Sequence, residues 1–293
     1  MEHAAAHDKP GETRRATLYV VATPIGNLAD ITGRALDVLR GVDAVAAEDT
    51  RITRRLLAHY GMDKRLIAVH EHNERSAAGK VIALLEAGRS VAYTTDAGTP
   101  GISDPGALLV SAVREAGFPV TPVPGPSAAV AALSVSGIAG PQFLFYGFLP
   151  ERASARRRAI EALAAQPFPV VFYEAPHRIA ECAADLCTVL GGERRIVIAR
   201  ELTKRFETVH ACALADAVAW LAADPMRRKG EFVLVVAGGA GAAADDDLGR
   251  RALDVLLAEL PLRQAVDLAA RIAGGKKNAL YRLALALKKG GER

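Results

Sequence analysis

The chain has 293 residues, 51% of them apolar and 24% charged, a composition that excludes a disordered or fibrous protein. The length predicts at least two domains, and no apolar run is long enough to span a membrane. Because the first 17 residues are polar and do not match a secretory signal, we expect a cytoplasmic protein that does not contact a membrane. The net charge of +4 favours an anionic partner.

Short β-branched runs alternate with helical patterns through the first half of the chain. Strands are expected at 18–22, 43–46, 65–69, 90–94 and 119–123, and helices at 31–40, 77–87 and 107–116. Repeated strand, helix and strand predict a mostly parallel sheet that is covered on both faces. We assign residues 18–138 to this first α/β lobe and expect residues 1–17 to form a disordered tail.

The alternation starts again after the glycine- and proline-rich segment 137–141, which predicts a domain boundary. Strands are expected at 142–147, 170–173, 195–199 and 232–236, helices at 151–165 and 179–190, and an antiparallel strand or hairpin at 206–213. Residues 139–240 are therefore expected to form a second α/β lobe.

The last part of the chain is basic and helical. Residues 238–247 have the composition of a linker, and three short helices beyond them each carry one apolar face. From Arg250 to the end, ten basic residues stand against four acidic ones. We expect residues 246–290 to form a basic three-helix module similar to a helix-turn-helix. The alternative is a helical cap on the second lobe.

Three turns rich in glycine and proline follow strands of the first lobe, where open α/β sheets bind ligands. They are 23–27 (TPIGN), 95–106 (TDAGTPGISDPG) and 124–128 (PGPSA). No P-loop or dinucleotide-binding motif is present, and the carboxylates of Asp96 and Asp104 suit a ligand that carries positive charge and hydroxyl groups. Asp104 directly precedes Pro105 and is expected to cap the next helix, whereas Asp96 is expected to face the ligand.

Charged segments follow other predicted strands. They are 48–51 (EDTR), 70–74 (HEHNE), 173–178 (YEAPHR) and 200–205 (RELTKR). Such residues can act as a general base, clamp phosphate or form salt bridges, and a solvated charge cluster is the alternative. No metal site is expected, because His70 and His72 lack a third ligand at a suitable spacing and the three cysteines form no C-x-x-C pair.

Eight segments in this order resemble those of the bacterial ribosomal RNA small subunit methyltransferase I family, within the tetrapyrrole methylase superfamily. They are TPIGN, AEDTR, HEHNE, TDAGTPGISDPG, PGPSA, GFLP (147–150), YEAPHR and ARELTK (199–204). The resemblance runs from about Leu18 to Val236, and the helical tail matches that family's basic extension. It implies a two-lobed α/β fold of the tetrapyrrole methylase type, with a cofactor cleft between the lobes, and a homodimer.

The activity implied by the resemblance is transfer of a methyl group from S-adenosylmethionine to RNA. The acceptor would be the ribose 2′-oxygen of a cytidine in the decoding centre of 16S ribosomal RNA, either as naked RNA or within the small ribosomal subunit. Two alternatives are a small-molecule (tetrapyrrole) methyltransferase and a non-catalytic RNA-binding factor of ribosome assembly.

The resemblance also implies roles for individual residues. The cofactor wall would consist of Pro24, Gly26, Asp96, Gly98, Thr99, Ile102, Ser127 and Ala128, with Tyr173 closing it from the second lobe. Glu174 is the candidate general base and Glu48 the alternative, unless both only orient arginines. The candidate RNA contacts are Arg51, His72, Asn73, His177, Arg178, Arg200, Lys204, Lys276 and Lys277. Replacing Gly98 by valine is expected to abolish cofactor binding with little loss of folding.

Overall fold

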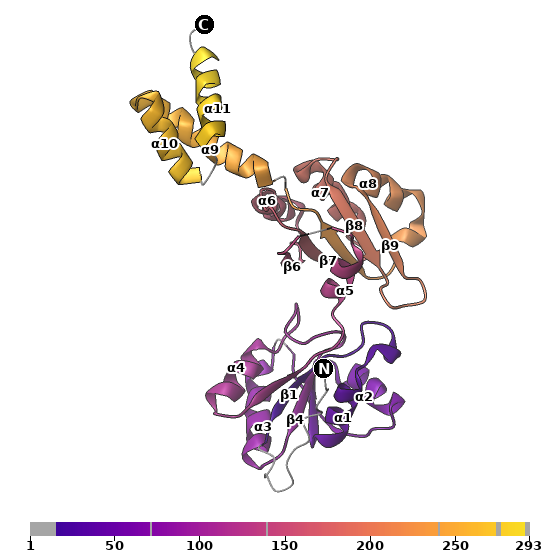
Figure 1. Cartoon of the computed structure of the whole chain (residues 1–293). Coiled ribbons are helices and arrows are strands. Elements are labelled where there is room, and N and C mark those ends of the chain that lie inside the picture. Colours follow the sequence, from indigo (N-terminus) through magenta and orange to yellow (C-terminus); the bar gives the residue numbers. More distant parts are fainter. Residues whose placement is uncertain (1–15, 71, 139, 240, 274–276, 291–293) are drawn as a thin grey trace, which may run out of the picture. The chain divides into compact units, whose positions relative to one another are not determined.

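The computed structural model describes residues 16–70, 72–138, 140–239, 241–273 and 277–290 (Figure 1). The chain divides into two compact units, Met1–Val135 with Ala199–Val209, and Ser136–Ile198 with His210–Arg293; each is described by itself. Most of the expected N-terminal tail lies outside the described residues, but Ala16 and Thr17 are buried and belong to the first unit. No helix in the described ranges is long and apolar enough to cross a membrane.

The first unit contains a five-stranded sheet in the order β3-β2-β4-β1-β5, in which the neighbouring strands run parallel. Its strands are β1 (Leu18–Val21), β2 (Ala44–Ala47), β3 (Arg65–Ala68), β4 (Val91–Thr94) and β5 (Val120–Val123). Every residue of β2 and β4 is buried, as expected of apolar runs in a sheet covered on both faces. The parallel sheet predicted from the strand and helix alternation is confirmed.

Helices pack on both faces of this sheet (Figure 1). They are α1 (Gly33–Gly41), α2 (Thr50–His59), α3 (Glu74–Glu86), α4 (Ala107–Glu115) and α5 (Ala128–Val135), with a short 3-10 helix, η1 (Leu28–Asp30). Leu18 and Val91 belong to an apolar cluster with residues of α3 and α4. Val21 and Ala92 point to the opposite face and belong to a cluster with residues of α1 and α2.

The start of α4 differs from the prediction. Its N-cap residue is Gly106, and the carboxylate of Glu74 accepts hydrogen bonds from the backbone nitrogens of Gly106 and Leu109, both at 3.0 Å. Glu74 lies in α3 and is buried. The expectation that Asp104 caps this helix is therefore wrong, because a side chain distant in sequence satisfies the free N–H groups at the helix start.

The second unit contains a mixed sheet in the order β6-β7-β10-β8-β9. Its strands are β6 (Leu144–Phe148), β7 (Val170–Glu174), β8 (Arg195–Arg200), β9 (Thr208–Ala213) and β10 (Phe232–Val236), with helices α6 (Ala153–Leu163), α7 (Ile179–Leu190) and α8 (Leu214–Ala223) and the 3-10 helix η2 (Pro225–Arg228). β6 runs parallel to β7, and β10 runs antiparallel to it. The second α/β sheet is confirmed, and the segment expected as a strand or hairpin forms the edge strand β9.

Three helices end the described chain: α9 (Gly241–Glu259), α10 (Leu262–Ala273) and α11 (Lys277–Gly290). Leu253, Val266, Ala269, Leu280 and Ala284 form their shared apolar core. The three predicted helices are confirmed, but the linker expected at 238–247 is wrong from Gly241 onward, because α9 begins there. The alanines at 242–244 are strong helix formers, and they outweigh the linker composition.

Candidate cofactor and substrate site

The three glycine- and proline-rich loops lie at one edge of the first sheet. They follow β1, β4 and β5, which are neighbours in the strand order. Thr23 and Gly98 exchange two backbone hydrogen bonds, of 2.8 and 3.1 Å. The hydroxyl of Thr99 donates to the carbonyl oxygen of Pro126 at 3.0 Å. The loops are thus bonded to one another before any ligand binds, which lowers the entropy lost on binding.

Gly98 has a backbone conformation that favours glycine, with φ of +80°. A Cβ at this position would lie 3.4 Å from Cγ2 of Ile25, an ordinary contact. The cost of a Gly98→Val substitution would therefore come from backbone strain as well as from any clash with a ligand. The expectation that this substitution leaves folding nearly unchanged is wrong, and the hydroxyl of Thr99 offers a cleaner test.

Gly26 lies beneath a lysine that is distant in sequence. A Cβ at Gly26 would come within 2.5 Å of Cγ of Lys204, whose ammonium group pairs with Glu201 at 2.9 Å. Lys204 belongs to the segment Ala199–Val209, which groups with the first unit. The sequence suggested Lys204 only as an RNA contact. No local pattern indicated that it would lie over the first loop, because the two residues are brought together by the tertiary fold.

The other candidates for the cofactor wall differ in exposure. Pro24 is buried, Ile102 is 39% exposed, and Ser127 and Ala128 are half-buried where α5 begins. Tyr173 is the last residue but one of β7 in the second unit, and its ring contacts those of Phe145 and Phe148. The loops of the first unit therefore bring all of the predicted wall together at one sheet edge except Tyr173.

Carboxylates gather at the same edge, after β2 and β4. The backbone nitrogen of Asp49 donates to the Asp96 carboxylate at 3.0 Å, and that of Asp96 donates to the Glu48 carboxylate at 3.4 Å. Asp49 also caps α2 and binds the guanidinium of Arg51 through both carboxylate oxygens. Glu48 and Asp96, predicted from separate motifs, are thus neighbours in the structure.

The ionisation of these carboxylates is set by their surroundings. Burial raises the pKa of Glu48 and of Asp96. Burial, with a contribution from the charge of Glu48, raises the pKa of Asp104 to about 6. Hydrogen bonds from Arg51 instead lower the pKa of Asp49 to about 2. Glu48, Asp96 and Asp104 therefore all resist ionisation. A bound cation would favour their ionised forms and offset the repulsion between their charges.

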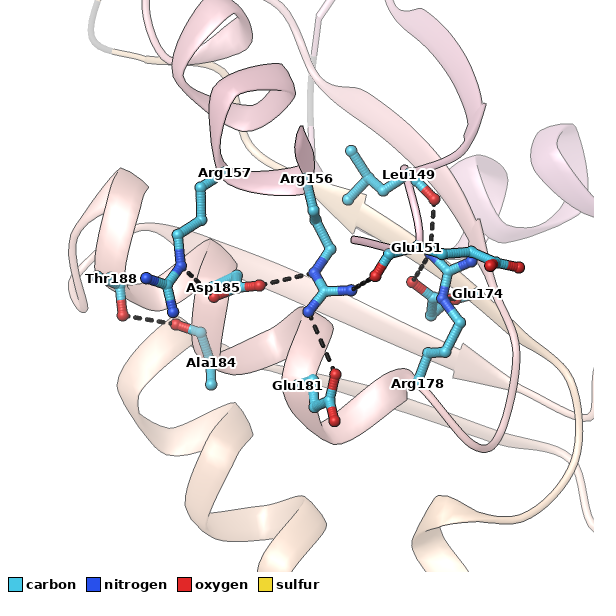
Figure 2. Close-up of polar contacts among 10 residues, drawn as sticks. All are labelled: Leu149, Glu151, Arg156, Arg157, Glu174, Arg178, Glu181, Ala184, Asp185 and Thr188. Carbon is cyan, nitrogen blue, oxygen red and sulfur yellow. Dashed lines mark hydrogen bonds and ion pairs between the residues drawn. The ribbon is translucent and has the colours of Figure 1, made fainter. Parts of the chain in front are cut away.

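Glu174, the first candidate for the general base, is buried at the end of β7. Its carboxylate pairs with Nε of Arg178 at 3.1 Å and accepts a hydrogen bond from the backbone nitrogen of Ala175 at 2.8 Å. Arg178 also donates to the carbonyl oxygen of Leu149 at 2.5 Å (Figure 2). This arrangement favours the alternative in which Glu174 orients an arginine.

The candidate RNA contacts divide into exposed and internally bonded residues. Arg51, His72, His177 and Lys277 are exposed, although Lys277 pairs with Asp267. Asn73 holds the loop after β3, because its amide bonds to the backbone of His70 and Ala68. Arg200 is buried and donates to the carbonyl oxygen of Phe206 at 3.2 Å. Lys276 lies outside the described residues.

Comparison with known proteins identifies similar families and folds. The family model "Tetrapyrrole (Corrin/Porphyrin) Methylases" matches residues 17–218, and "RsmI C-terminal HTH domain" matches residues 242–288. Two solved structures share the fold. A uroporphyrin-III C-methyltransferase from Thermus thermophilus is 22% identical, with a TM-score of 0.55 over 79% of this chain and 98% of that one. A cobalt precorrin-4 methyltransferase is 17% identical, with a TM-score of 0.58 over 78% and 96%.

Curated relatives are similar over nearly the whole chain. The ribosomal RNA small subunit methyltransferase I of Escherichia coli O157:H7 is 49% identical over 97% of this chain and 98% of its own. The proteins of the same name from Pseudomonas aeruginosa and Xylella fastidiosa (strain Temecula1) are 51% and 53% identical, over 92% and 90% of this chain and 96% and 97% of their own. These similarities include the C-terminal helices, because they cover at least 90% of this chain.

Proposed function

The chain belongs to the tetrapyrrole methylase family and, within it, to the ribosomal RNA small subunit methyltransferase I proteins, and we propose that it methylates the 2′-oxygen of a cytidine ribose in 16S ribosomal RNA. It is an S-adenosylmethionine-dependent rRNA methyltransferase. The observation that carries this assignment is identity of about half the residues through both sheets and the C-terminal helices. The resemblance of its motifs supports the decoding centre as the location of the cytidine.

The loops after β1, β4 and β5 are proposed to hold S-adenosylmethionine. Their mutual hydrogen bonds and the absence of a Cβ at Gly98 allow the backbone to approach a ligand closely. Carboxylates at the same edge suit a sulfonium cation and ribose hydroxyls. When bound, the cofactor supplies an electrophilic methyl group. The proposed contacts in the first unit are Pro24, Gly26, Asp96, Gly98, Thr99, Ile102, Ser127 and Ala128.

The ribose hydroxyl must lose its proton, and we assign to Glu48 the role of the general base that accepts it. Its side chain is half-buried, and burial raises its pKa, which makes it a stronger base. Glu174 is the other candidate, but its carboxylate already binds Arg178 within the second unit. The exposed Arg51, His72 and His177 are proposed to contact RNA phosphates.

The oligomeric state and compartment are part of the same proposal. We propose a homodimer that acts in the cytoplasm on 16S ribosomal RNA or the small ribosomal subunit. The support is the resemblance to the family, whose members are usually dimers. Sedimentation of the purified chain tests the dimer, which a single monomer boundary at micromolar concentration would contradict.

Methyl transfer from radiolabelled S-adenosylmethionine tests the function. Unmethylated small subunits, naked 16S RNA and uroporphyrinogen are offered separately as acceptors. We expect label in RNA, and we expect alkaline hydrolysis to stop at a single cytidine, because a 2′-O-methyl group protects the adjoining phosphodiester. Label in uroporphyrinogen alone would indicate a tetrapyrrole methyltransferase, and no label in any acceptor would indicate a non-catalytic assembly factor.

A further inference from the structure

The loop between β8 and β9 contains the segment RELTKR, which has no role in the function proposed above. The strands on either side belong to the second sheet, but Ala199–Val209 groups with the first unit. The sequence suggests Arg200 and Lys204 as RNA contacts, yet the structure shows both bonded to groups of the same loop. The loop at 201–207 is therefore a part of the second half of the chain that belongs with the cofactor loops.

Lys204 lies across Gly26 in the first of the glycine- and proline-rich loops. A Cβ at Gly26 would come within 2.5 Å of Cγ, 3.2 Å of Cδ and 2.9 Å of Cε of the lysine. Three successive methylene carbons therefore cover the backbone at this point, as lysine side chains often do when the ammonium group reaches a polar partner. Gly26 itself stays exposed, so its remaining surface is open to a ligand.

The ammonium group of Lys204 is anchored within its own loop. It pairs with the carboxylate of Glu201 at 2.9 Å, and the side chains of Lys204 and Glu201 are only 26% and 17% exposed. Water and salt screen a partly buried pair less than a surface pair. The backbone nitrogen of Lys204 also donates to the carbonyl oxygen of Glu201 at 3.0 Å. The lysine is thus held at its backbone and at the end of its side chain.

Two residues before this lysine adopt a backbone conformation that favours glycine. Glu201 has a φ of +52° and Thr203 a φ of +65°, and positive φ is an outlier for a β-branched residue. Among the residues that the structure describes, the buried hydroxyl oxygen of Thr203 also lacks a hydrogen-bond partner. Strained conformations persist only where the surrounding contacts hold them, and they are frequent at ligand clamps. Here the strained residues set the direction in which Lys204 leaves the loop.

Gly26 is connected to the second cofactor loop through its neighbour Ile25. Ile25 is buried, and its Cγ2 would lie 3.4 Å from a Cβ at Gly98. At the start of the first loop, Thr23 exchanges backbone hydrogen bonds with Gly98. The contact with Lys204 holds the other end, so the backbone from Thr23 to Gly26 is fixed on both sides.

We propose that Lys204 is a positioning residue for the cofactor: its methylene groups hold loop 23–27 in the conformation that accepts S-adenosylmethionine, and Glu201 fixes the lysine in place. The inference rests on the proposed placement of the cofactor at the three loops. A loop that is ordered before binding loses less entropy when the ligand binds. This role depends on the packing of the side chain, whereas a contact with RNA phosphate depends on its charge.

Calorimetry of S-adenosylmethionine binding to Lys204 variants tests the role of packing. Lys204→Ala should weaken binding by about 3- to 10-fold, because the ligand must then order the loop. Lys204→Met keeps an unbranched, flexible side chain and should bind almost as tightly as the wild type. Arg205→Met removes the charge of the next residue, which lies over the ring of Phe206, and should leave the affinity unchanged. Equal weakening by Lys204→Ala and Lys204→Met would assign the ammonium group to the cofactor and overturn the proposal.

Glu201→Gln tests the anchor of the lysine. This substitution keeps the size of the side chain but removes its charge, so it should weaken S-adenosylmethionine binding in the wild-type background. In the Lys204→Met background it should have no further effect, because no ammonium group is left to hold. An equal loss in both backgrounds would contradict the anchoring role of Glu201.

Hydrogen exchange of the backbone amides at 23–28 measures the loop directly. Without ligand, this segment should exchange faster in Lys204→Ala than in the wild type, but not in Lys204→Met. Saturating S-adenosylmethionine should slow its exchange in all three proteins. Unchanged exchange in Lys204→Ala would show that the lysine does not hold the loop. An equal increase in β2 and β4 would indicate a general loss of stability and would also contradict the proposal.

RNA binding and the behaviour of the wild type separate this inference from the proposed function. If Lys204→Ala and Lys204→Met both reduce the slope of log RNA affinity against log salt by about 0.7 to 0.9, Lys204 is a phosphate contact instead. If the wild type binds S-adenosylmethionine and methylates RNA but Lys204→Ala binds the cofactor equally well, the positioning role is wrong and the function stands. If the wild type binds no S-adenosylmethionine, the function itself is wrong.

Discussion

Glu48, Asp49, Asp96 and Asp104 follow β2 and β4, and they differ in how strongly each retains its proton. Hydrogen bonds from Arg51 lower the pKa of Asp49 to about 2, while burial raises that of Asp104 to about 6. Asp49 is therefore ionised throughout the physiological range, and its hydrogen bonds to α2 and Arg51 are structural. Asp104 changes charge closest to neutral pH, so a cationic ligand would be sensitive to its state.

The affinity for S-adenosylmethionine should therefore depend on pH. Below pH of about 6 Asp104 is protonated, and above it the carboxylate can attract the sulfonium. We expect the affinity to rise by up to about five-fold between pH of about 5 and 7, the contribution of one charge pair that solvent partly screens. Calorimetry at several pH values measures it, and Asp104→Asn should flatten the rise.

The free energy of unfolding should change with pH in the direction opposite to the cofactor affinity. Because the pKa of Asp104 is raised in the folded protein, the folded state holds its proton more tightly than the unfolded chain does. Its contribution to the free energy of unfolding therefore falls as pH rises from about 4 to about 6. In urea titrations without cofactor, Asp104→Asn should lose less stability than the wild type over this interval; an equal loss would mean that another acid dominates.

Thr99 connects two of the loops through one hydroxyl. Thr99→Val keeps the shape of the side chain but removes the hydrogen bond to Pro126, which should lower the free energy of unfolding by about 1 kcal/mol. It should also weaken S-adenosylmethionine binding, because the loops must then be ordered by the ligand. Thr99→Ser keeps the hydroxyl and should restore both in melting and calorimetry. If Thr99→Val and Thr99→Ser bind S-adenosylmethionine with equal affinity, the hydrogen bond to Pro126 does not contribute to cofactor binding.

At the scale of secondary-structure elements, buried carboxylates join helices that are distant in sequence. Glu74 in α3 accepts the first hydrogen bonds of α4. Asp185 in α7 binds Arg156 and Arg157 of α6, both at 2.6 Å (Figure 2). In each case one side chain satisfies groups that would be costly to bury unpaired.

Removing the cap of α4 should destabilise the first unit. Glu74→Ala leaves two backbone N–H groups without their charged acceptor and should lower the free energy of unfolding by about 2 kcal/mol. Asp104→Ala lacks this effect if Glu74 is the cap. Urea unfolding of the two variants decides whether Glu74 or Asp104 caps α4. A larger loss in the free energy of unfolding for Asp104→Ala would mean that Asp104 is the cap, as the sequence suggested.

Removing Asp185 should cost more, because the buried Arg156 would keep only the longer contact of 3.4 Å to the exposed carboxylate of Glu181. Asp185→Ala is expected to lower the free energy of unfolding by about 3 to 5 kcal/mol, whereas Arg156→Met with Asp185→Leu should recover much of it. Burial opposes ionisation of Asp185, but hydrogen bonds from Arg157 and Arg156 outweigh it and lower its pKa. Its contribution is therefore present at neutral pH and lost on acidification. In thermal melts, the Tm values of the variants should differ from that of the wild type at pH of about 7 and approach it at pH of about 3.

At the scale of the whole molecule, the C-terminal helices form a module with an apolar core of their own. The C-terminal family match covers residues 242–288, and from Arg250 to the end ten basic residues stand against four acidic ones. Within it, Lys277 at the start of α11 pairs with Asp267 of α10, and both side chains are more than half exposed. An exposed pair of this kind is weak, so RNA phosphate can replace the aspartate.

Substitutions of Lys277 and of Asp267 should therefore change the affinity for RNA in opposite directions. Lys277→Ala should weaken binding and reduce the slope of log affinity against log salt by about 0.9 for a duplex contact. Asp267→Asn frees the lysine and should strengthen binding at low salt. Filter binding at several salt concentrations measures both. If neither variant changes the affinity for RNA, the surface of α10 and α11 that carries this pair does not contact RNA, and the helices act as a structural cap.

The sequence by itself determined the strands and most helices, because these depend on local hydrophobic period, glycine and proline, but it did not predict α2, α5 or α8. It also placed the three glycine- and proline-rich loops together, since the carboxyl ends of parallel strands must meet at one edge. It misplaced the start of α9, where helix propensity and linker composition compete within ten residues (238–247).

Only the tertiary structure decided which charged groups meet. The cap of α4 by Glu74, the lysine over Gly26 and the pairing of Arg156 with Asp185 depend on side chains brought together by packing. The sequence offered several equivalent acids and bases for each role. Choosing among them requires distances and burial, because the energy of a charge depends on its neighbours in space and on its exclusion from water.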